Sequence, residues 1–511
     1  MIEIPVERRA RYLRNCRILA IASSLTALLY LKWLLFDARP ENPLLFYLLV
    51  TAEVFNVIQA AGFWYTISIQ KWTEPLPADF ASSQETIDVF ITVCGEPAEI
   101  VEPTIRGALA MRHPRKKVWV LDDGRSPEIE WLARRLGAGY LVRANRRGAK
   151  AGNINAALAR TTGHFVLILD ADHVPKPQFL ERTLGLFADR RVAFVQTPQV
   201  YANRSSNRVA AGSHEQQALF YGPILRGKSA AGAVFSCGTN VVFRRSALAA
   251  VGGMPEDSIT EDLRVSLILA RAGYRSEYVP LVLAEGMGPV DVAGYFSQQA
   301  RWARGGLEIM LRRRPFFFGM GLPAGVQYGL SFAYWFTGWA YLSYLVLPVA
   351  YLLFGQRPVQ VPNQYPAYFL PYIVTTMLTM AYAADFRLTY RAVWFTLASF
   401  PVHIGALRSA ILGRARRFVV TSKAGAIRSL RPARVHVLVL AVLGLAAVLG
   451  FARMGLTPAV MNNVAFVVGH TSIVYGFVRY SLKPEEESAG VMETAEERAP
   501  VRAAIVDEEG V

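Results

Sequence analysis

The chain has 511 residues, of which 53% are hydrophobic and only 18% charged, and its formal net charge is +16. This length allows two or three domains, or one domain with a membrane region, and the apolar excess favours the second arrangement. The arginines lie beside hydrophobic segments, as in cytoplasmic loops of membrane proteins, so no nucleic-acid partner is expected. Cys16, Cys94 and Cys237 have no paired or zinc-like spacing, which predicts free thiols in a reducing compartment.

Two hydrophobic segments come first. Residues 1–17 contain five arginines and precede the apolar segment Ile18–Phe36, and a second apolar segment covers Pro43–Ile69. A basic flank before a span predicts a cytoplasmic N-terminus, and without a small-residue cleavage site the first span is expected to be an anchor. Residues 1–70 are therefore predicted to form an N-terminal membrane region of two helices.

From residue 71 to 315, short apolar runs alternate with amphipathic stretches, which is typical of an α/β domain. The predicted strands are Val89–Val93, Val118–Leu121, Tyr140–Val142, Phe165–Leu169 and Val192–Val195. The predicted helices are Pro97–Met111, Pro127–Leu136, Ala149–Ala159 and Leu263–Ala272. Because two crossings precede this domain, we expect it on the cytosolic side of the membrane, with the N-terminus.

Hydrophobicity returns after residue 315, and residues 316–482 are predicted to form a second membrane region. Its candidate spans are Leu330–Phe354, Tyr368–Ala384, Val435–Phe451 and Asn463–Tyr480. Between them, the arginine-rich segment Arg387–Arg434 has a mixed apolar pattern and is expected to lie along the cytoplasmic interface. Residues 483–511 are acidic and poor in aromatic residues, so this tail is expected to be disordered. The pattern as a whole predicts a multi-pass protein of the plasma (inner) membrane.

The candidate site begins with two carboxylates at the end of a predicted strand. The run Phe165–Leu169 fits a strand buried on both faces, and Asp170 and Asp172 follow it. Ligands bind open α/β sheets beyond the carboxyl ends of the strands. Two hard oxygen donors there suit Mg²⁺, or alternatively Mn²⁺, held mainly through the phosphates of a substrate. A strand-end turn with carboxylates bonded to backbone amides explains an isolated D-x-D equally well.

Other polar residues fall where neighbouring strands should end. Asp122 and Asp123 follow one predicted strand and Glu96 follows another, and carboxylates accept hydrogen bonds from ribose hydroxyls and a base N–H. Lys150 lies among small residues at the start of a predicted helix, a position that suits an anion. Each of these clusters, taken singly, is also ordinary turn chemistry.

Two further motifs lie later in the chain. The stretch Thr260–Asp262 places a threonine to cap the following helix and two acids in its first turn, and an acid there, such as Asp262, is also a candidate general base. Gln298, Arg301 and Trp302 form a Q-x-x-R-W motif, in which an arginine can neutralise a departing diphosphate and an indole can carry a sugar ring. Taken alone, a packed tryptophan beside a lipid-facing arginine explains the second motif better.

Together these motifs resemble the processive family 2 glycosyltransferases, and among them the catalytic subunits of bacterial cellulose synthases. D-D-G, D-x-D, T-E-D and Q-x-x-R-W occur in the order and spacing of that family. The strings A-K-A-G-N, D-A-D-H-V-P and F-S-C-G also look like the cellulose synthase versions. Phe418–Lys423 matches the F-x-V-T-x-K motif of the family's gating loop, and the resemblance covers roughly residues 85–425.

The resemblance implies an α/β GT-A (Rossmann-like nucleotide-sugar) catalytic domain embedded in a polytopic α-helical membrane protein. It implies an inverting enzyme that polymerises a β-linked, cellulose-like glucan from UDP-glucose with Mg²⁺ and moves the polymer across the membrane. The catalytic residues that it implies are Thr260, Glu261, Asp262 and Arg301, and the metal ligands are Asp172 and Asp170. The substrate-binding residues that it implies are Glu96, Asp122, Asp123, Lys150, Asp170, Cys237, Gln298, Arg301, Trp302, Phe418, Thr421 and Lys423. The implied partners are the UDP-sugar, the growing polysaccharide, the lipid bilayer and, as a further candidate, an accessory secretion subunit.

The chain departs from the family pattern in three places. V-C-G-E-P at Val93–Pro97 replaces T-Y-N-E-P, which keeps Glu96 but changes the contacts before it. No PilZ-like motif follows the last span, so cyclic diguanylate control within this chain is not expected, and two spans rather than four precede the catalytic domain.

Three alternatives stay open: a chitin-, hyaluronan- or mixed-linkage-type polymerase, a non-processive lipid glycosyltransferase, and an inactive transporter or sensor. The last predicts loss of Asp170, Asp172 or Asp262, and all three are present.

Overall fold

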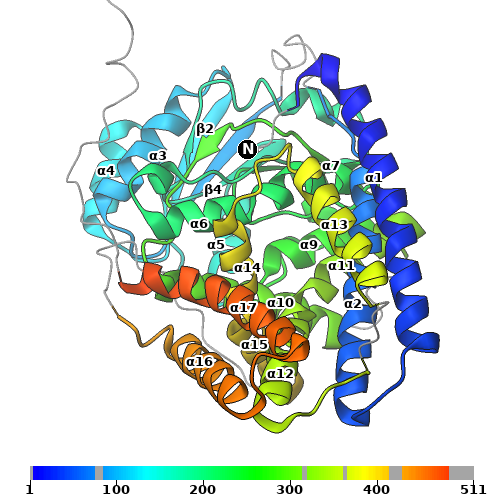
Figure 1. The fold of residues 1–511 in the computed structure, drawn as a ribbon. Helices are drawn as coiled ribbons and strands as arrows, with labels where there is room; N and C mark the ends of the chain where they lie inside the picture. Colours follow the sequence, from blue (N-terminus) through cyan, green and yellow to red (C-terminus); the bar gives the residue numbers. More distant parts are fainter. Residues whose placement is uncertain (1–3, 75–84, 313–318, 361–364, 414–428, 483–511) are drawn as a thin grey trace, which may run out of the picture.

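The fold is described from a computed structural model of the chain, which describes residues 4–74, 85–312, 319–360, 365–413 and 429–482. A mixed α/β part lies against a set of long helices, with α1 and α2 along its right side and α12, α15, α16 and α17 below it in the view of Figure 1. The predicted gating-loop residues Phe418, Thr421 and Lys423 and the acidic tail lie outside the described residues.

A seven-stranded mixed sheet forms the centre of the α/β part. Its strands are β1 (Ile87–Val93), β2 (Lys116–Asp122), β3 (Gly139–Leu141), β4 (Phe165–Asp170), β6 (Val192–Gln196), β7 (Val241–Arg244) and β8 (Arg275–Tyr278). Their order is β3-β2-β1-β4-β7-β6-β8, and β7 runs antiparallel to β4 and β6 while the remaining pairs are parallel. A second small sheet pairs β5 (Val174–Pro175) with β9 (Ala284–Glu285). All five strands predicted from the sequence are confirmed, and β7 and β8 were not predicted.

Helices cover both faces of the large sheet because its central strands are apolar on both sides. They are α3 (Ala98–Ala110), α4 (Pro127–Leu136), α5 (Ala149–Leu158), α6 (Arg208–Gln216), α7 (Leu225–Ala230), α8 (Arg245–Ala250) and α9 (Glu261–Arg271). Leu167 and Leu169 of β4 belong to the core under α3 and α4, whereas the alternate residues Val166 and Ile168 belong to the core under α5, α8 and α9. The period-2 alternation of a strand explains this division. Short 3₁₀ or π turns occur at Trp33–Asp37 (η1), Leu184–Ala188 (η3), Ala202–Ser205 (η4), Phe220–Ile224 (η5) and Tyr334–Phe336 (η6).

The long helices come from the two ends of the chain. They are α1 (Val6–Lys32), α2 (Pro43–Ser68), α10 (Val292–Arg312), α11 (Leu322–Ala333), α12 (Thr337–Phe354), α13 (Tyr365–Ala383), α14 (Tyr390–Ala398), α15 (Phe400–Leu412), α16 (Arg434–Met454) and α17 (Pro458–Leu482). Among the described residues, five helical stretches are long and apolar enough to cross a membrane: Val6–Asp37, Pro43–Ser68, Leu322–Phe354, Tyr390–Leu412 and Arg434–Met454.

These five stretches agree only partly with the predicted spans. Tyr390–Leu412 falls in the segment that the sequence assigned to the interface, whereas the predicted spans Tyr368–Ala384 and Asn463–Tyr480 are the helices α13 and α17, which are less apolar. In the structure α13 lies against α1, and α17 lies against α16 and α12. The number of times that the chain crosses a membrane therefore stays a prediction, because the candidate spans are chosen by length and composition alone.

Helix α10 joins the α/β part to the long helices. Near its start, Val292 and Tyr295 share a buried cluster with Val209 of α6, Phe395 of α14 and Phe477 of α17. Further along, α10 packs against α15 through small and aliphatic side chains. Side chains on α10 are consequently held by packing on both parts of the molecule.

A buried ion pair between Asp88 and Arg245 lies at the end of the sheet opposite the candidate site. The Asp88 carboxylate of β1 accepts hydrogen bonds from Arg245 Nη2 at 2.7 Å, the Gly163 amide at 2.6 Å and Trp119 Nε1 at 2.9 Å. Three donors on one buried carboxylate offset the cost of removing it from water.

Removing this carboxylate should destabilise the sheet. Asp88→Ala leaves Arg245 without its counter-ion, and the loss of one partner of a buried pair costs about 3–5 kcal/mol. For a chain of this size the apparent midpoint of thermal unfolding, measured on the full chain in detergent, should fall by roughly 5–10 °C. Glu130→Ala, which removes the exposed pair with Arg134, serves as the control and should change the midpoint by less than about 2 °C. Equal effects of the two substitutions would contradict the role given to Asp88.

Candidate active site

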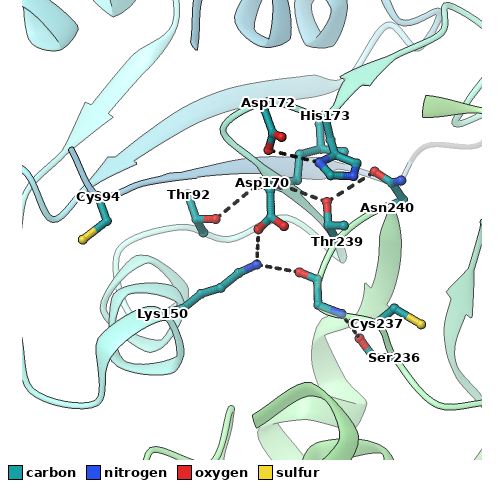
Figure 2. Close-up of polar contacts among 12 residues, drawn as sticks. Thr92, Cys94, Lys150, Asp170, Asp172, His173, Ser236, Cys237, Thr239 and Asn240 are labelled. Atoms are coloured by element: carbon teal, nitrogen blue, oxygen red, sulfur yellow. Dashed lines mark hydrogen bonds and ion pairs between the residues drawn. The ribbon is translucent and has the colours of Figure 1, made fainter. Parts of the chain in front are cut away.

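Two carboxylates and a histidine lie together at the carboxyl end of strand β4 (Figure 2). They are Asp170, the last residue of the strand, and Asp172 and His173, which follow it. Asp172 and His173 are each 5% exposed, and His173 Nδ1 lies 3.2 Å from Asp172 Oδ1. The Met287 amide donates to the other oxygen of Asp172 at 3.0 Å. Ligand atoms of Asp170, Asp172 and His173 all lie within 4.8 Å of one another.

This donor set fits a divalent cation. The two carboxylates supply the oxygen ligands that Mg²⁺ and Mn²⁺ prefer, and the imidazole of His173 adds a nitrogen donor of the kind that transition metals accept. Nε2 of His173 is buried with no hydrogen-bond partner among the described residues. The sequence predicted Asp170 and Asp172 but not His173, although His173 follows the D-x-D directly. The sequence signal that could have identified His173 is the string D-A-D-H, because the histidine directly follows Asp172 in the turn at the end of the strand.

Lys150 lies at the centre of the site. Its ammonium donates to Asp170 Oδ1 and, at 2.8 Å, to the Gly238 carbonyl, as Figure 2 shows. Burial alone would raise the pKa of Asp170, but the charges of Lys150 and His173 outweigh it and hold this pKa below its ordinary value. Burial likewise acts to lower the pKa of Lys150, but the charges of Asp170 and Glu261 raise it above its ordinary value. The lysine and Asp170 therefore stabilise each other's charged form.

The first turn of α9 brings a second pair of acids to the same place. The Leu263 amide donates to Asp262 Oδ1 at 2.8 Å, and a Cβ added to Gly238 would lie 3.0 Å from Asp262 Oδ2. Gly238 has φ +81°, so the backbone that separates Lys150 from Asp262 favours glycine for its conformation. Gly238 thus lies between the D-x-D side and the T-E-D side of the site.

Burial raises the pKa of both acids of this pair. For Glu261 burial and the neighbouring Asp262 raise the pKa to about 7, although Lys150 and Arg301 act to lower it. For Asp262 burial also dominates and raises the pKa, against the Leu263 amide, Arg301 and Lys150. A carboxylate with raised proton affinity, flanked by two cations, is suited to accept a proton from a bound group.

The prediction that the Thr260 side chain caps α9 is wrong. Thr260 is the residue before the helix, but its side chain makes no capping hydrogen bond. It instead packs against α10, where a Cβ added to Gly305 would lie 2.3 Å from the threonine Oγ1. A tertiary contact therefore replaces the local preference of threonine for the N-cap.

The carboxylates after β1 and β2 lie at the same edge of the sheet, but local bonds engage them. Asp122 accepts from the Gly124 and Ser126 amides at 2.6 and 2.8 Å and from the Tyr140 hydroxyl at 2.9 Å, which is the turn chemistry that the sequence left open. Asp123 forms a buried two-pronged pair with Arg143, at 2.7 Å to Nε and 2.6 Å to Nη2.

Glu96, the candidate after β1, accepts from the Cys94 amide at 2.6 Å. A carboxylate has about four lone-pair positions, so Glu96 and Asp123 retain capacity for a ligand, whereas Asp122 has little.

The Q-x-x-R-W motif lies on α10. Arg301 lies near enough to Glu261 and Asp262 to lower the pKa of both. Trp302 is half-buried, and Gln298 has a buried Oε1 with no partner among the described residues. The structure thus brings the arginine of this motif to the acids of α9.

Cys237 belongs to the loop that carries Gly238. Burial and the charge of Asp262 raise the pKa of its thiol to about 12, so it is neutral and not a nucleophile at physiological pH. Gln199, which the sequence analysis missed, donates to its carbonyl at 3.2 Å, and the Gln196 side chain accepts from its amide at 2.8 Å. Nothing local in the sequence marks these two glutamines, because they reach the loop from a different strand end.

Comparisons with known proteins agree with the fold. Residues 165–478 match the sequence family described as "Glycosyl transferase family group 2". The cellulose synthase catalytic subunit [UDP-forming] of Pseudomonas fluorescens is 33% identical over 395 residues, 75% of this chain and 52% of that relative. The corresponding subunit of Komagataeibacter sucrofermentans is 32% identical over 391 residues, 73% of this chain and 52% of that relative. This chain therefore spans about half the length of these two relatives.

Among solved structures, a mannosyltransferase from Pyrobaculum calidifontis, in complex with GDP-Man and Mn²⁺, has a similar fold. Its TM-score is 0.53 at 19% sequence identity, and the match covers 73% of this chain and all (100%) of that chain. At this identity the likeness shows the fold alone.

The donor set predicts direct metal binding. Asp172→Ala removes a buried carboxylate from the cluster, so Mn²⁺ affinity of the purified full chain, measured by electron paramagnetic resonance, should fall at least about tenfold. Glu181→Gln, which changes a carboxylate paired with Arg112 away from the cluster, should leave the affinity unchanged. Equal Mn²⁺ binding by wild type and Asp172→Ala would exclude this cluster as the metal site.

Proposed function

Because the chain belongs to the family 2 glycosyltransferases, we propose that it is a membrane-embedded, processive, inverting enzyme that builds a β-linked glucan from UDP-glucose. Its α/β part has the GT-A-like, Rossmann-type mixed sheet that the sequence predicted. The observation that carries the proposal is the placement of Asp262 across Gly238 from Lys150 and Asp170, with Arg301 beside it. The names of the relatives support a cellulose-like product and a UDP-sugar donor.

The donor side of the site is the carboxyl edge of the sheet. Asp170, Asp172 and His173 would hold a divalent cation, Mg²⁺ or Mn²⁺, because their ligand atoms all lie within 4.8 Å of one another. When bound, such a cation supplies positive charge that neutralises the diphosphate of a nucleotide sugar. Lys150, at the first turn of α5, adds a second positive charge at the same place. Glu96 and Asp123 have the remaining capacity to accept bonds from the base and ribose.

On the acceptor side, Asp262 would take the proton from the terminal hydroxyl of the growing chain as that oxygen attacks the anomeric carbon. Single displacement from the face opposite UDP converts an α-linked donor to a β-glycoside. The burial that raises the pKa of Asp262 makes it a stronger base than a solvated aspartate, and transfer should slow as the pH falls through this raised value. Arg301 would meet the negative charge that develops on the departing UDP, and Trp302 would carry the last sugar ring of the acceptor.

The long helices offer polar groups in their interior for a polysaccharide to contact. Both ring nitrogens of His403 on α15 and the Tyr341 hydroxyl on α12 are buried and lack hydrogen-bond partners among the described residues. The ring centroids of Tyr334 and Trp335 lie 5.8 and 5.2 Å from that of His403, and Trp335 also lies against Gly306 of α10. Buried polar groups are nearly always paired, and the hydroxyls of a sugar chain would pair these. A polymer that extends from Trp302 past His403 and Tyr341 would cross the membrane without being released from the enzyme. A non-processive lipid glycosyltransferase would not need such a path.

The chain would lie in the inner membrane with its α/β part in the cytosol, where UDP-sugars are made. The apolar stretches of α1, α2 and α16 support membrane embedding, and their outward-facing leucines and valines are exposed in the isolated chain.

Asp262→Asn tests the proposed chemistry. The amide cannot accept the acceptor proton, and loss of a general base lowers the rate by on the order of 10²–10⁴-fold. Transfer of labelled glucose from UDP-glucose by reconstituted protein should fall by that factor, while calorimetric UDP affinity stays nearly unchanged because the nucleotide is held elsewhere. Asp189→Asn, an exposed carboxylate outside the site, serves as the control. Activity of Asp262→Asn within a few-fold of wild type would remove Asp262 from the mechanism.

Cysteine labelling tests the proposed topology. In a chain with Cys94 replaced by serine, Leu456→Cys lies in the exposed turn between α16 and α17, and Arg134→Cys lies on the exposed face of α4. An impermeant maleimide should label Leu456→Cys on spheroplasts, whereas Arg134→Cys should react only after lysis. Labelling of Arg134→Cys from outside would overturn the cytosolic placement of the α/β part.

A further inference from the structure

Helix α10 passes the start of α9 at very close range, and a glycine lies at the contact. Gly305 is buried, and a Cβ added to it would lie 2.3 Å from both Oγ1 and Cγ2 of Thr260. Non-bonded carbon atoms pack at about 3.5–4.0 Å, so no other residue at this position could keep the two elements where they are. The separation between α9 and α10 at this contact is therefore too small for any residue larger than glycine.

Thr260 contributes packing rather than capping to this contact. It is 6% exposed, and its hydroxyl has no hydrogen-bond partner among the described residues. The side chain fills the space between the first residue of α9 and the backbone of α10. Displacement of Thr260 would therefore displace Glu261 and Asp262, which follow it in the chain.

Helix α10 is held on a second side as well. A Cβ added to the next residue, Gly306, would lie 2.7 Å from Nε1 of Trp335. In addition, Ala303 and Leu307 of α10 pack against Ala406 and Ala410 of α15. Because close-packed interiors transmit a local change in volume, a methyl group at position 305 would move α9 rather than let α10 retreat.

The same face of α10 carries the arginine of the site. Arg301 precedes Gly305 by four residues, and residues four apart lie on one face of a helix, one turn from each other. Consistent with this placement, the charge of Arg301 lowers the pKa of both Glu261 and Asp262. The Gly305–Thr260 contact and the approach of Arg301 to Asp262 are thus two points on one helix–helix junction.

We propose that Gly305 is a positioning residue, whose lack of a side chain sets the separation between Asp262 on α9 and Arg301 on α10. The inference rests on the proposed function, in which these two groups act on the acceptor hydroxyl and on the departing diphosphate. Gly305 itself touches neither substrate nor cation, so its effect passes through Thr260.

Gly305→Ala tests the role of this contact. Misplacement of a reacting group by about 1 Å can cost on the order of 10²-fold in rate, so kcat for glucose transfer should fall roughly 10–100-fold. The KM for UDP-glucose and the affinity for UDP should stay within about threefold, because the groups that hold the nucleotide lie on other elements. This division between kcat and KM separates misplacement from partial unfolding, which would lower the amount of active protein and the number of UDP sites together.

A second-site change and a matched control complete the test. Adding Thr260→Ala to Gly305→Ala removes Oγ1 and Cγ2 and leaves Thr260 Cβ, at 2.8 Å, as the nearest atom of that side chain. The double variant should therefore recover part of the kcat lost by Gly305→Ala alone. Gly405→Ala on α15 places the same methyl group where nothing lies within 4 Å, and it should leave kcat unchanged.

Two outcomes would overturn the proposal: a kcat of Gly305→Ala equal to that of Gly405→Ala, or a double variant no better than Gly305→Ala. Either result, with wild type active and Asp262→Asn inactive, would refute the role of Gly305 and leave the proposed function standing. Absence of sugar transfer by the wild type would refute the proposed function itself.

Discussion

Crowding of negative charge around Lys150 is the constraint on which the site depends. Asp170, Glu261 and Asp262 act on this one ammonium group, and burial opposes the ionised form of each. Lys150 connects the D-x-D side of the site with the T-E-D side. Its ammonium donates to Asp170 and to the carbonyl of Gly238, and the carboxylate of Asp262 lies beside Gly238. Without a cation there, like charges in a low-dielectric pocket would keep their protons. Lys150 and Arg301 therefore oppose the effect of burial and favour the ionised form of the acids, which both parts of the proposed mechanism require.

Backbone packing then fixes where these charges lie. Gly238 permits close approach of the Cys237 loop to Asp262, and Gly305 permits close approach of α10 to Thr260. At Gly305 the contact requires the absence of a Cβ, whereas at Gly238 the left-handed backbone conformation favours glycine. The site is thus assembled from the carboxyl edge of the sheet, the first turns of α5 and α9, and helix α10, which continues into contact with α11 and α15. In the proposed function, the acceptor would then lie on the side of the site that faces the long helices.

Local signals in the sequence predicted the elements that depend on local chemistry. Helix α4 has the predicted bounds Pro127–Leu136 because Ser126 caps its start and Gly137 ends it in the left-handed conformation. Strand β4 was found because its apolar run is continuous. Strand β8 was missed because three of its four residues, Arg275, Ser276 and Glu277, are polar. Strand β7, an apolar run of three residues before Arg244, was missed as well.

Tertiary contacts account for what the sequence did not predict. The cap assigned to Thr260 fails because its side chain packs against α10 instead of bonding the first turn of α9. Neither His173 as a third donor nor Gly305 as a spacer is marked by periodicity or charge. His173 shares the turn of the D-x-D and could have been noticed there, whereas the role of Gly305 emerges only when α9 and α10 are brought together.

The measurement that tests the account most directly is incorporation of sugar from individual labelled donors. Purified chain reconstituted in vesicles, with Mg²⁺ or Mn²⁺, would be incubated with each UDP-sugar in turn, and the product digested with linkage-specific hydrolases. The account predicts a long polymer labelled from UDP-glucose alone and degraded by a β-glucanase. Label confined to a lipid carrying one or a few sugars, or a polymer labelled only from another UDP-sugar, would contradict it.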